Sequence, residues 1–321
     1  MNFEFSEEQV MLRDSVARYV QDDYDWETRV AIAGSEAGID RAKWQTFAEL
    51  GWLSIPFAEE HGGFGGGPLD VMVVMEELGK GLVLEPYLAT VLLYGGLLQK
   101  GGSARQQEAR IPSIIDGSSL GAFAYLERQS RFETSDVLTT ATATDGGYAL
   151  NGEKVVVFNG MSADQLIVSA RTSGEQSDEQ GISLFLVAAD AEGIESVSYR
   201  MMDGQRVSNI VFKDVQVAAD DLVGELDGGH ALINAVARDA NLALSAEALG
   251  IMAQLNAKTA EYARTREQFG VAIGKFQALQ HRMVDTFISY EQTKSMLYRA
   301  VCALTDDQED EDQAIHALRM M

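Results

Sequence analysis

The chain is poor in cysteine, histidine and proline. Among its 321 residues there are one cysteine, four histidines and four prolines. The single Cys302 excludes an intramolecular disulfide, and the scattered histidines form no pair at metal-ligand spacing. We therefore expect neither a disulfide-stabilised fold nor a metal site.

Positive charge is also scarce. The chain has 25 lysines and arginines against 49 aspartates and glutamates, a formal net charge of -24. Such an excess repels the phosphate backbone of nucleic acids and the surface of anionic membranes. We expect neither as a partner, and any polyanionic ligand must be held by a local group of cations.

Long hydrophobic runs and a basic leader are missing too. The least charged long stretch, Ala240 to Ala257, contains Glu247 and is bracketed by Asp239 and Lys258, which indicates a buried helix rather than a membrane span. The first basic residue is Arg13, after three glutamates, so no signal-peptide n-region is evident. The expected compartment is the cytoplasm.

Hydrophobic spacing divides the chain into three regions. Residues 1–116 have helical spacing, and Ser6 with Gln9 is typical of a capping box. Residues 117–225 follow period two, and residues 226–321 form long helices. With 46% hydrophobic residues the chain can bury a large core, and its length suggests two or three domains. The predicted fold class is α+β.

Glycine and acidic clusters mark the expected connections. Within 117–225 we predict hairpin turns at Asp145-Gly146-Gly147, Asn151-Gly152 and Asn159-Gly160. The glycine-rich segment 62–68 is predicted to be a loop between helices, because no strand precedes it and it matches no phosphate-binding pattern. The acidic run 306–312 is predicted to be a solvated connection between helices.

The clearest chemical signal is the pattern R-x-x-F-G-x-x-I-x-x-F-Q-x-x-x-H, which runs from Arg266 to His281. We predict a helix from about Ala231 to Arg266, ended by Gly270 in a left-handed cap, and a new helix near Lys275. A guanidinium on a rigid helix end is a suitable clamp for a phosphate or pyrophosphate. Alternatively, Arg266 only complements the helix dipole and the phenylalanines are core.

This pattern, preceded by Tyr262, resembles the signature of the acyl-CoA dehydrogenase flavoproteins, in which this arginine and phenylalanine lie against the FAD of a neighbouring subunit. The resemblance extends over essentially the whole chain, through Ser6–Gln9, Gly51–Leu53, Glu59–Gly63, Glu76–Gly79, Val83–Tyr87 and Glu127–Arg131. The last two segments are similar to the small subunit of pimeloyl-CoA dehydrogenase-type enzymes.

The resemblance implies an N-terminal helical domain (1–116), a middle β-barrel domain (117–225) and a C-terminal helical bundle (226–321). We expect that bundle to be incomplete, since the sequence ends at Met321. The implied cofactor is FAD, and the implied reaction is α,β-desaturation of an acyl-CoA. The implied partners are a homologous subunit in a heterotetramer, or further copies in a homo-oligomer, and an electron-transfer flavoprotein as electron acceptor.

A candidate base lies on the long predicted helix. Glu247 is the only ionisable residue between Ala240 and Ala257, and its helical neighbours are small or apolar, which suggests burial for a purpose. The resemblance implies that a glutamate on this helix is the catalytic base in some steroid- and dicarboxylate-degrading relatives. Most members of the family instead use a glutamate in the C-terminal part of the chain. An exposed helix former or a structural ion pair remains open for Glu247, and Asp239 is the second candidate.

Two flavin-facing segments depart from the family pattern. In place of T-E-P-x-x-G-S-D the chain has Leu126 followed by Glu127-Arg128-Gln129, and in place of W-x-T-N-G it has Val156-Val157-Phe158-Asn159-Gly160. Leu126 and Phe158 therefore occupy cofactor-facing positions without the usual hydroxyls, and the stacking indole is lost. We expect a smaller subunit that lends Arg266, Phe269 and Gln277 to an FAD seated largely in its partner.

Overall fold

The computed structural model describes residues 5–305 and 311–320, and it divides into two compact units. The first unit comprises the chain up to residue 29, residues 67–83, and the chain from residue 241 onward. The second comprises residues 30–66 and 84–240. No helix among the described residues is both long and apolar enough to cross a membrane.

The first unit is helical. Its elements are α1 (Glu7–Asp23), the start of α2 (Trp26–Gly34), α4 (Pro68–Gly81), the later part of α7 (Gly229–Thr265), β9 (Glu267–Gln268), β10 (Val271–Ala272), the 3-10 turn Ile273–Lys275, α8 (Gln277–Thr305) and α9 (Glu311–Arg319). The predicted capping box is confirmed at the start of α1, where Gln9 N donates to Ser6 Oγ at 3.2 Å and Ser6 N donates to Gln9 Oε1 at 3.0 Å.

The structure describes only the end of the acidic run 306–312. Residues 306–310, the centre of the predicted solvated connection, lie outside the described residues. α9 begins at Glu311, and Asp312 lies in its first turn. The acidic side chain of Asp312 is favourable there, because the N-terminal end of a helix carries partial positive charge.

Within the first unit, α4 and α7 approach closely enough to require glycine on both helices. A Cβ built on Gly79 would lie 2.2 Å from Glu247 O, and one built on Gly250 would lie 1.9 Å from Glu76 O. Real side chains cannot occupy such positions without moving the backbone. The helix that carries Glu247 is thereby fixed against α4.

The second unit combines short helices with a sheet. Its helical elements are the rest of α2, α3 (Arg41–Glu49), the 3-10 turns Trp52–Ser54, Glu59–His61 and Ala219–Asp221, the π-helix Tyr87–Tyr94, α5 (Gly95–Gly101), α6 (Ala104–Ile115) and the start of α7. The glycine-rich segment forms a loop before α4, as predicted.

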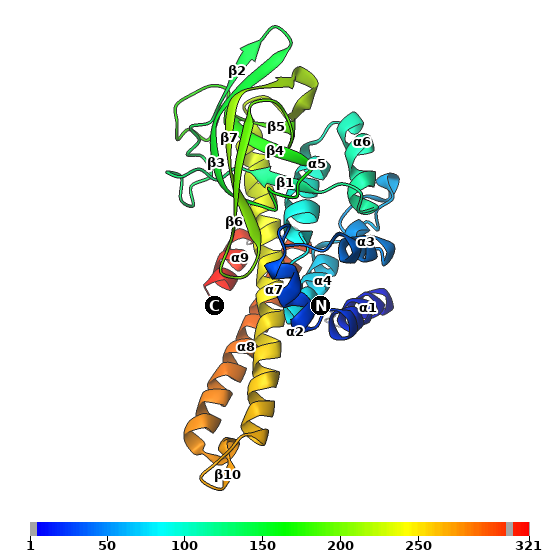
Figure 1. The fold of residues 1–321 in the computed structure, drawn as a ribbon, viewed down its shortest axis with the longest axis vertical. Coiled ribbons are helices and arrows are strands. Elements are labelled where there is room, and N and C mark those ends of the chain that lie inside the picture. The colour runs from blue at the N-terminus through cyan, green and yellow to red at the C-terminus, as the bar shows by residue number, and fades with distance from the viewer. Residues whose placement is uncertain (1–4, 306–310, 321) are drawn as a thin grey trace. The chain divides into compact units, whose positions relative to one another are not determined.

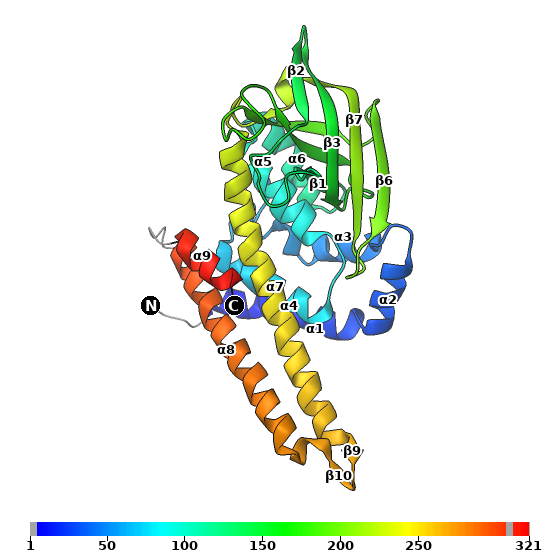
Figure 2. The same ribbon diagram turned by 90° about the vertical axis from the view of Figure 1, so that its left-hand side faces the viewer.

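Eight strands make one sheet in this unit, which Figure 1 shows in green to yellow-green. They are β1 (Gly121–Ala124), β2 (Thr140–Thr144), β3 (Gly147–Phe158), β4 (Gln165–Arg171), β5 (Ile182–Ala188), β6 (Ile194–Arg200), β7 (Arg206–Ala218) and β8 (Leu222–Val223). Their order is β6-β7-β3-β2-β4-β5-β8, and β1 pairs in parallel with β4. Figure 2 shows β3, β7 and β6 side by side.

Burial explains the sheet's composition. Apolar side chains from β3, β4, β5 and β7 form its core, among them Leu150, Val168, Phe185 and Phe212. β6 lies at an edge and is mostly exposed, and polar residues on such an edge discourage pairing with another chain. The predicted α+β architecture of helices, sheet and helices is confirmed.

The three predicted turns have different outcomes. Asp145-Gly146 forms the two-residue turn between β2 and β3, as predicted. The turn at Asn151-Gly152 is wrong, because both residues lie inside β3, where the pairing with β7 shifts register next to Gly152. Asn159-Gly160 does turn the chain after β3, but β3 does not pair with β4, so no hairpin forms there.

Candidate functional site

The Arg266 corner is a β-hairpin between two helices. Figure 2 shows it where α7 (yellow) ends and α8 (orange) begins. Arg266 N still donates to Tyr262 O at 2.9 Å, and Ile273 N donates to Arg266 O at 2.8 Å, which closes the corner. Between them, β9 and β10 pair through Gln268 and Val271.

The prediction that Gly270 forms a left-handed helix cap is therefore wrong. Gly270 has φ 78° and Phe269 has φ 54°, so both lie in the left-handed region, but they form the two-residue turn of the hairpin. Positive φ at both central residues is typical of the turns that match the twist of paired strands. The helix after the corner begins at Gln277, slightly later than predicted.

The predicted ligand-binding side chains at this corner are exposed. Phe269 is 92% exposed, and its ring makes an edge-to-face contact with Phe276, with centroids 6.2 Å apart. Arg266 and Gln277 are exposed as well, and no ion pair joins Arg266 to any residue between 5–305 or 311–320. The guanidinium is thus available to a group from outside the unit.

The two other predicted cofactor-facing residues lie in the second unit. Leu126 follows β1, and its carbonyl accepts a hydrogen bond from Val155 N at 2.8 Å. Phe158 is the last residue of β3 and lines a small hollow together with Pro86, Leu88 and Asn159. Leu126 and Phe158 are both half-buried.

Asn159 adds a polar atom to this hollow. The side chain is 7% exposed, and its amide nitrogen has no hydrogen-bond partner among the described residues. An unsatisfied buried donor is costly unless a ligand or water accepts from it. The sequence predicted only a turn at Asn159, so this donor was missed.

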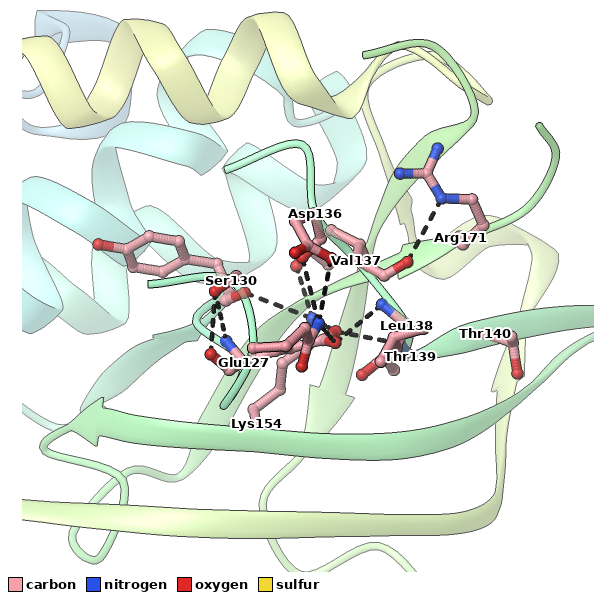
Figure 3. A network of polar contacts seen from close by, with 12 residues as sticks. Glu127, Ser130, Asp136, Val137, Leu138, Thr139, Thr140, Lys154 and Arg171 are labelled. Atoms are coloured by element: carbon pink, nitrogen blue, oxygen red, sulfur yellow. Dashed lines mark hydrogen bonds and ion pairs between the residues drawn. The ribbon is translucent and has the colours of Figure 1, made fainter. Parts of the chain in front are cut away.

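A buried ion pair fixes the segment that carries Leu126 (Figure 3). Lys154 of β3 places its ammonium 2.7 Å from Glu127 Oε1 and also donates to Ser169 Oγ at 2.9 Å. The Glu127 carboxylate accepts two backbone hydrogen bonds, from Leu138 N at 2.8 Å and Thr139 N at 3.0 Å. One carboxylate thus holds both ends of the loop between β1 and β2.

Burial and charge shift both groups of this pair. Burial alone raises the pKa of Glu127, but Lys154 and the hydrogen bonds outweigh it and lower the pKa to about 2. Burial lowers the pKa of Lys154 to about 8, although Glu127 opposes the shift. At neutral pH both groups are charged and the pair is intact.

The candidate bases have separate environments. Glu247 is half-buried on α7, between buried Ala246 and exposed Ala248, and its backbone lies against Gly79. Asp239 belongs to the second unit and pairs with Lys100 at 3.0 Å, where both side chains are 39% exposed. Asp239 is accordingly engaged in an ion pair.

Comparison with known proteins identifies the family. Models of the N-terminal, middle and C-terminal domains of acyl-CoA dehydrogenases match residues 6–118, 122–215 and 227–321. The chain is 31% identical over 312 residues to "Probable acyl-CoA dehydrogenase YngJ" of Bacillus subtilis. The aligned region covers 94% of this chain and 80% of that protein. The chain belongs to the acyl-CoA dehydrogenase family.

Solved structures of relatives agree with this assignment. PigA with FAD and proline superposes with a TM-score of 0.91 at 28% identity, covering 99% of this chain and 84% of PigA. A chain of the ChsE4-ChsE5 complex from Mycobacterium tuberculosis superposes with a TM-score of 0.88 at 28% identity, covering 99% and 83%. The cofactor of this family is FAD.

The described residues are chemically suited to that cofactor. The exposed Arg266 guanidinium matches a diphosphate, and an exposed aromatic such as Phe269 suits a planar ring. In the second unit, Asn159 offers an unpaired donor next to half-buried Phe158. These groups supply charge, stacking surface and a hydrogen-bond donor.

Proposed function

We propose that the chain is a subunit of an FAD-dependent acyl-CoA dehydrogenase that desaturates a CoA thioester between its α- and β-carbons. Within that class we infer a smaller subunit of the pimeloyl-CoA dehydrogenase type, paired with a homologous chain. The proposed substrate is the thioester of a dicarboxylate, a steroid side chain or a similar bulky acid. The proposed electron acceptor is an electron-transfer flavoprotein, and the proposed compartment is the cytoplasm.

The observation that carries this proposal is the state of Phe269. A bulky residue with φ 54° is uncommon, because the left-handed region crowds its Cβ, and here the side chain gains almost no burial in return. Local strain that packing does not repay is typical of functional positions. The strained Phe269 and the unpaired Arg266 together support a contribution to a neighbouring chain's site.

Each residue has a proposed role. FAD, when bound, would supply the hydride acceptor for the bond that breaks at the substrate's β-carbon. Arg266 holds the cofactor's diphosphate, and Phe269 and Gln277 contact it across the subunit boundary. Leu126 and Phe158 provide an apolar wall in place of the family's hydroxyls, and Glu247 removes the α-proton.

Purification tests the heteromer. The chain is expressed alone and together with the product of the neighbouring gene, and the flavin spectrum and turnover are recorded for each preparation. We expect substoichiometric FAD for the chain alone, and full FAD and turnover for the pair. Stoichiometric FAD and turnover by the chain alone would contradict the proposal, and no flavin in either preparation would favour a non-enzymatic scaffold.

A second version keeps the heteromer but removes Glu247 from the chemistry. In this version Glu247 only helps to fix α7 against α4, through the close approach of its backbone to Gly79. The Glu247→Gln variant in the reconstituted complex separates the versions. A loss of turnover with unchanged FAD content supports Glu247 as the base, whereas unchanged turnover assigns the base to the partner.

A further inference from the structure

A hollow of about 930 Å³ lies in the first unit among α1, α2, α4 and α7. Its walls are largely apolar and include Val20, Trp26, Ile251 and Leu255. Trp26 is 65% exposed and Leu255 is 58% exposed. Two large apolar side chains therefore face solvent beside a concave surface, which is typical of a ligand site.

The charged groups of the hollow leave one cation unpaired. Both acids are engaged: Glu77 accepts from Lys80 Nζ at 2.6 Å, and Asp25 Oδ1 accepts from Thr28 N at 2.8 Å. Lys258 is exposed and forms no ion pair with any residue that the structure describes. An incoming anion would find Lys258 free to pair.

A third cation stabilises the aromatic wall. The Arg29 guanidinium lies 5.6 Å from the centre of the Trp26 ring, and its Nε donates to Leu82 O at 2.8 Å. The ring is thereby held at the hollow's edge. The lining carries two acids, Asp25 and Glu77, against Lys80 and Lys258, so the hollow lacks the acidic excess of a chain with a net charge of -24.

We propose that this hollow binds an amphipathic monoanion, an aliphatic chain with a terminal carboxylate. The carboxylate pairs with Lys258, and the chain lies against Val20, Ile251 and Leu255. Aliphatic walls favour a flexible hydrocarbon over a nucleotide base. The site is independent of the flavin chemistry proposed above.

The tryptophans provide a selective probe. Trp44 and Trp52 are fully buried, so acrylamide quenching of tryptophan fluorescence in the full chain reports mainly Trp26. We expect decanoate to protect Trp26 saturably and decanol to bind about tenfold more weakly, because it lacks the charge-assisted hydrogen bond. Equal protection by decanol, or protection by AMP and not by decanoate, would overturn the proposal.

Two lysine variants localise the binding. Lys258→Gln is expected to weaken decanoate binding about tenfold, and Lys275→Gln, an exposed lysine of the same unit outside the hollow, should leave it unchanged. Lys258 is preferable to Lys80, whose removal would leave buried Glu77 unpaired. Unchanged decanoate affinity in Lys258→Gln would refute the site.

Discussion

At the residue scale, the ion pair between Glu127 and Lys154 illustrates how one buried contact organises a loop. Lys154 is fully buried, so either partner alone would be an uncompensated charge in an apolar sheet. The carboxylate also accepts from the backbone at Leu138 and Thr139. Breaking the pair therefore releases the segment that carries Leu126.

Substituting Lys154 measures this contribution. We expect Lys154→Met to lower the free energy of unfolding by about 3–5 kcal/mol, because Glu127 is left buried and unpaired. The matched control is Lys213→Met, which removes an exposed pair with Glu195 from the same sheet and should cost at most about 1 kcal/mol. Similar losses for both variants in urea unfolding would contradict the assigned role.

The same ion pair predicts that the free energy of unfolding falls at acid pH. The pKa of Glu127 is about 2 in the folded chain, below the 4.5 of an unperturbed glutamate, so the folded state holds its proton less tightly than the unfolded state. This contribution of about 3 kcal/mol is complete above pH 4.5 and is lost as the pH falls toward 2. Unfolding measured across that range should show a shallower decline in the Glu127→Gln, Lys154→Met double variant.

At the element scale, the hairpin between α7 and α8 has a residue in its turn that the turn conformation disfavours and that the proposed cofactor contact requires. Asparagine followed by glycine is the preferred pair for such a turn, yet the chain has Phe269 there. We expect Phe269→Asn to keep or raise the melting temperature while it weakens FAD binding by the assembled enzyme. A variant with unchanged FAD affinity would show that the phenylalanine has no role in the cofactor site.

Helix packing gives a second prediction at this scale. Gly79→Ala and Gly250→Ala each force a methyl group against the facing backbone and should cost about 1–3 kcal/mol. Gly34→Ala is the control, since a Cβ there meets nothing within 4 Å. If thermal unfolding shows equal stability for all three variants, α4 and α7 are not packed as closely as described.

Elements with strong local signals were predictable, and those decided by tertiary contacts were not. The capping box at Ser6 and the turn at Asp145-Gly146 follow from local sequence alone. Asn151-Gly152 has hairpin chemistry, but pairing with β7 keeps it inside β3 with a register shift. That irregularity also interrupts the alternation, so no pattern indicated that Lys154 points into the core.

The sequence predicted which residues are candidates for the site, but not how exposed each of them is. The motif singled out Arg266, Phe269 and Gln277, and their exposure depends on a hairpin that the sequence suggested only as a helix end. Glu247 was singled out by its apolar neighbours, of which Ala243 is buried and Leu244 is 43% exposed. Its role as base, like the domain boundaries at 116 and 225, stays a prediction.

At the scale of the whole molecule, we propose that one chain contributes residues to the cofactor site of another chain. The proposed assembly of homologous chains rests on the exposed Arg266 corner and on the altered flavin-facing residues Leu126 and Phe158. Because Arg266 is proposed to act across the boundary, its loss must affect a cofactor bound largely by the other chain. That expectation separates a shared site from a self-contained one.

The most direct measurement is the FAD content of the assembled complex with Arg266→Ala in this chain only and a wild-type partner. Arg266→Lys serves as the second variant, because lysine keeps the charge and loses the bidentate geometry. We predict an intact complex that loses most of its FAD with alanine and retains part of it with lysine. Full FAD content in the intact Arg266→Ala complex would contradict the claim that this corner completes the partner's flavin site.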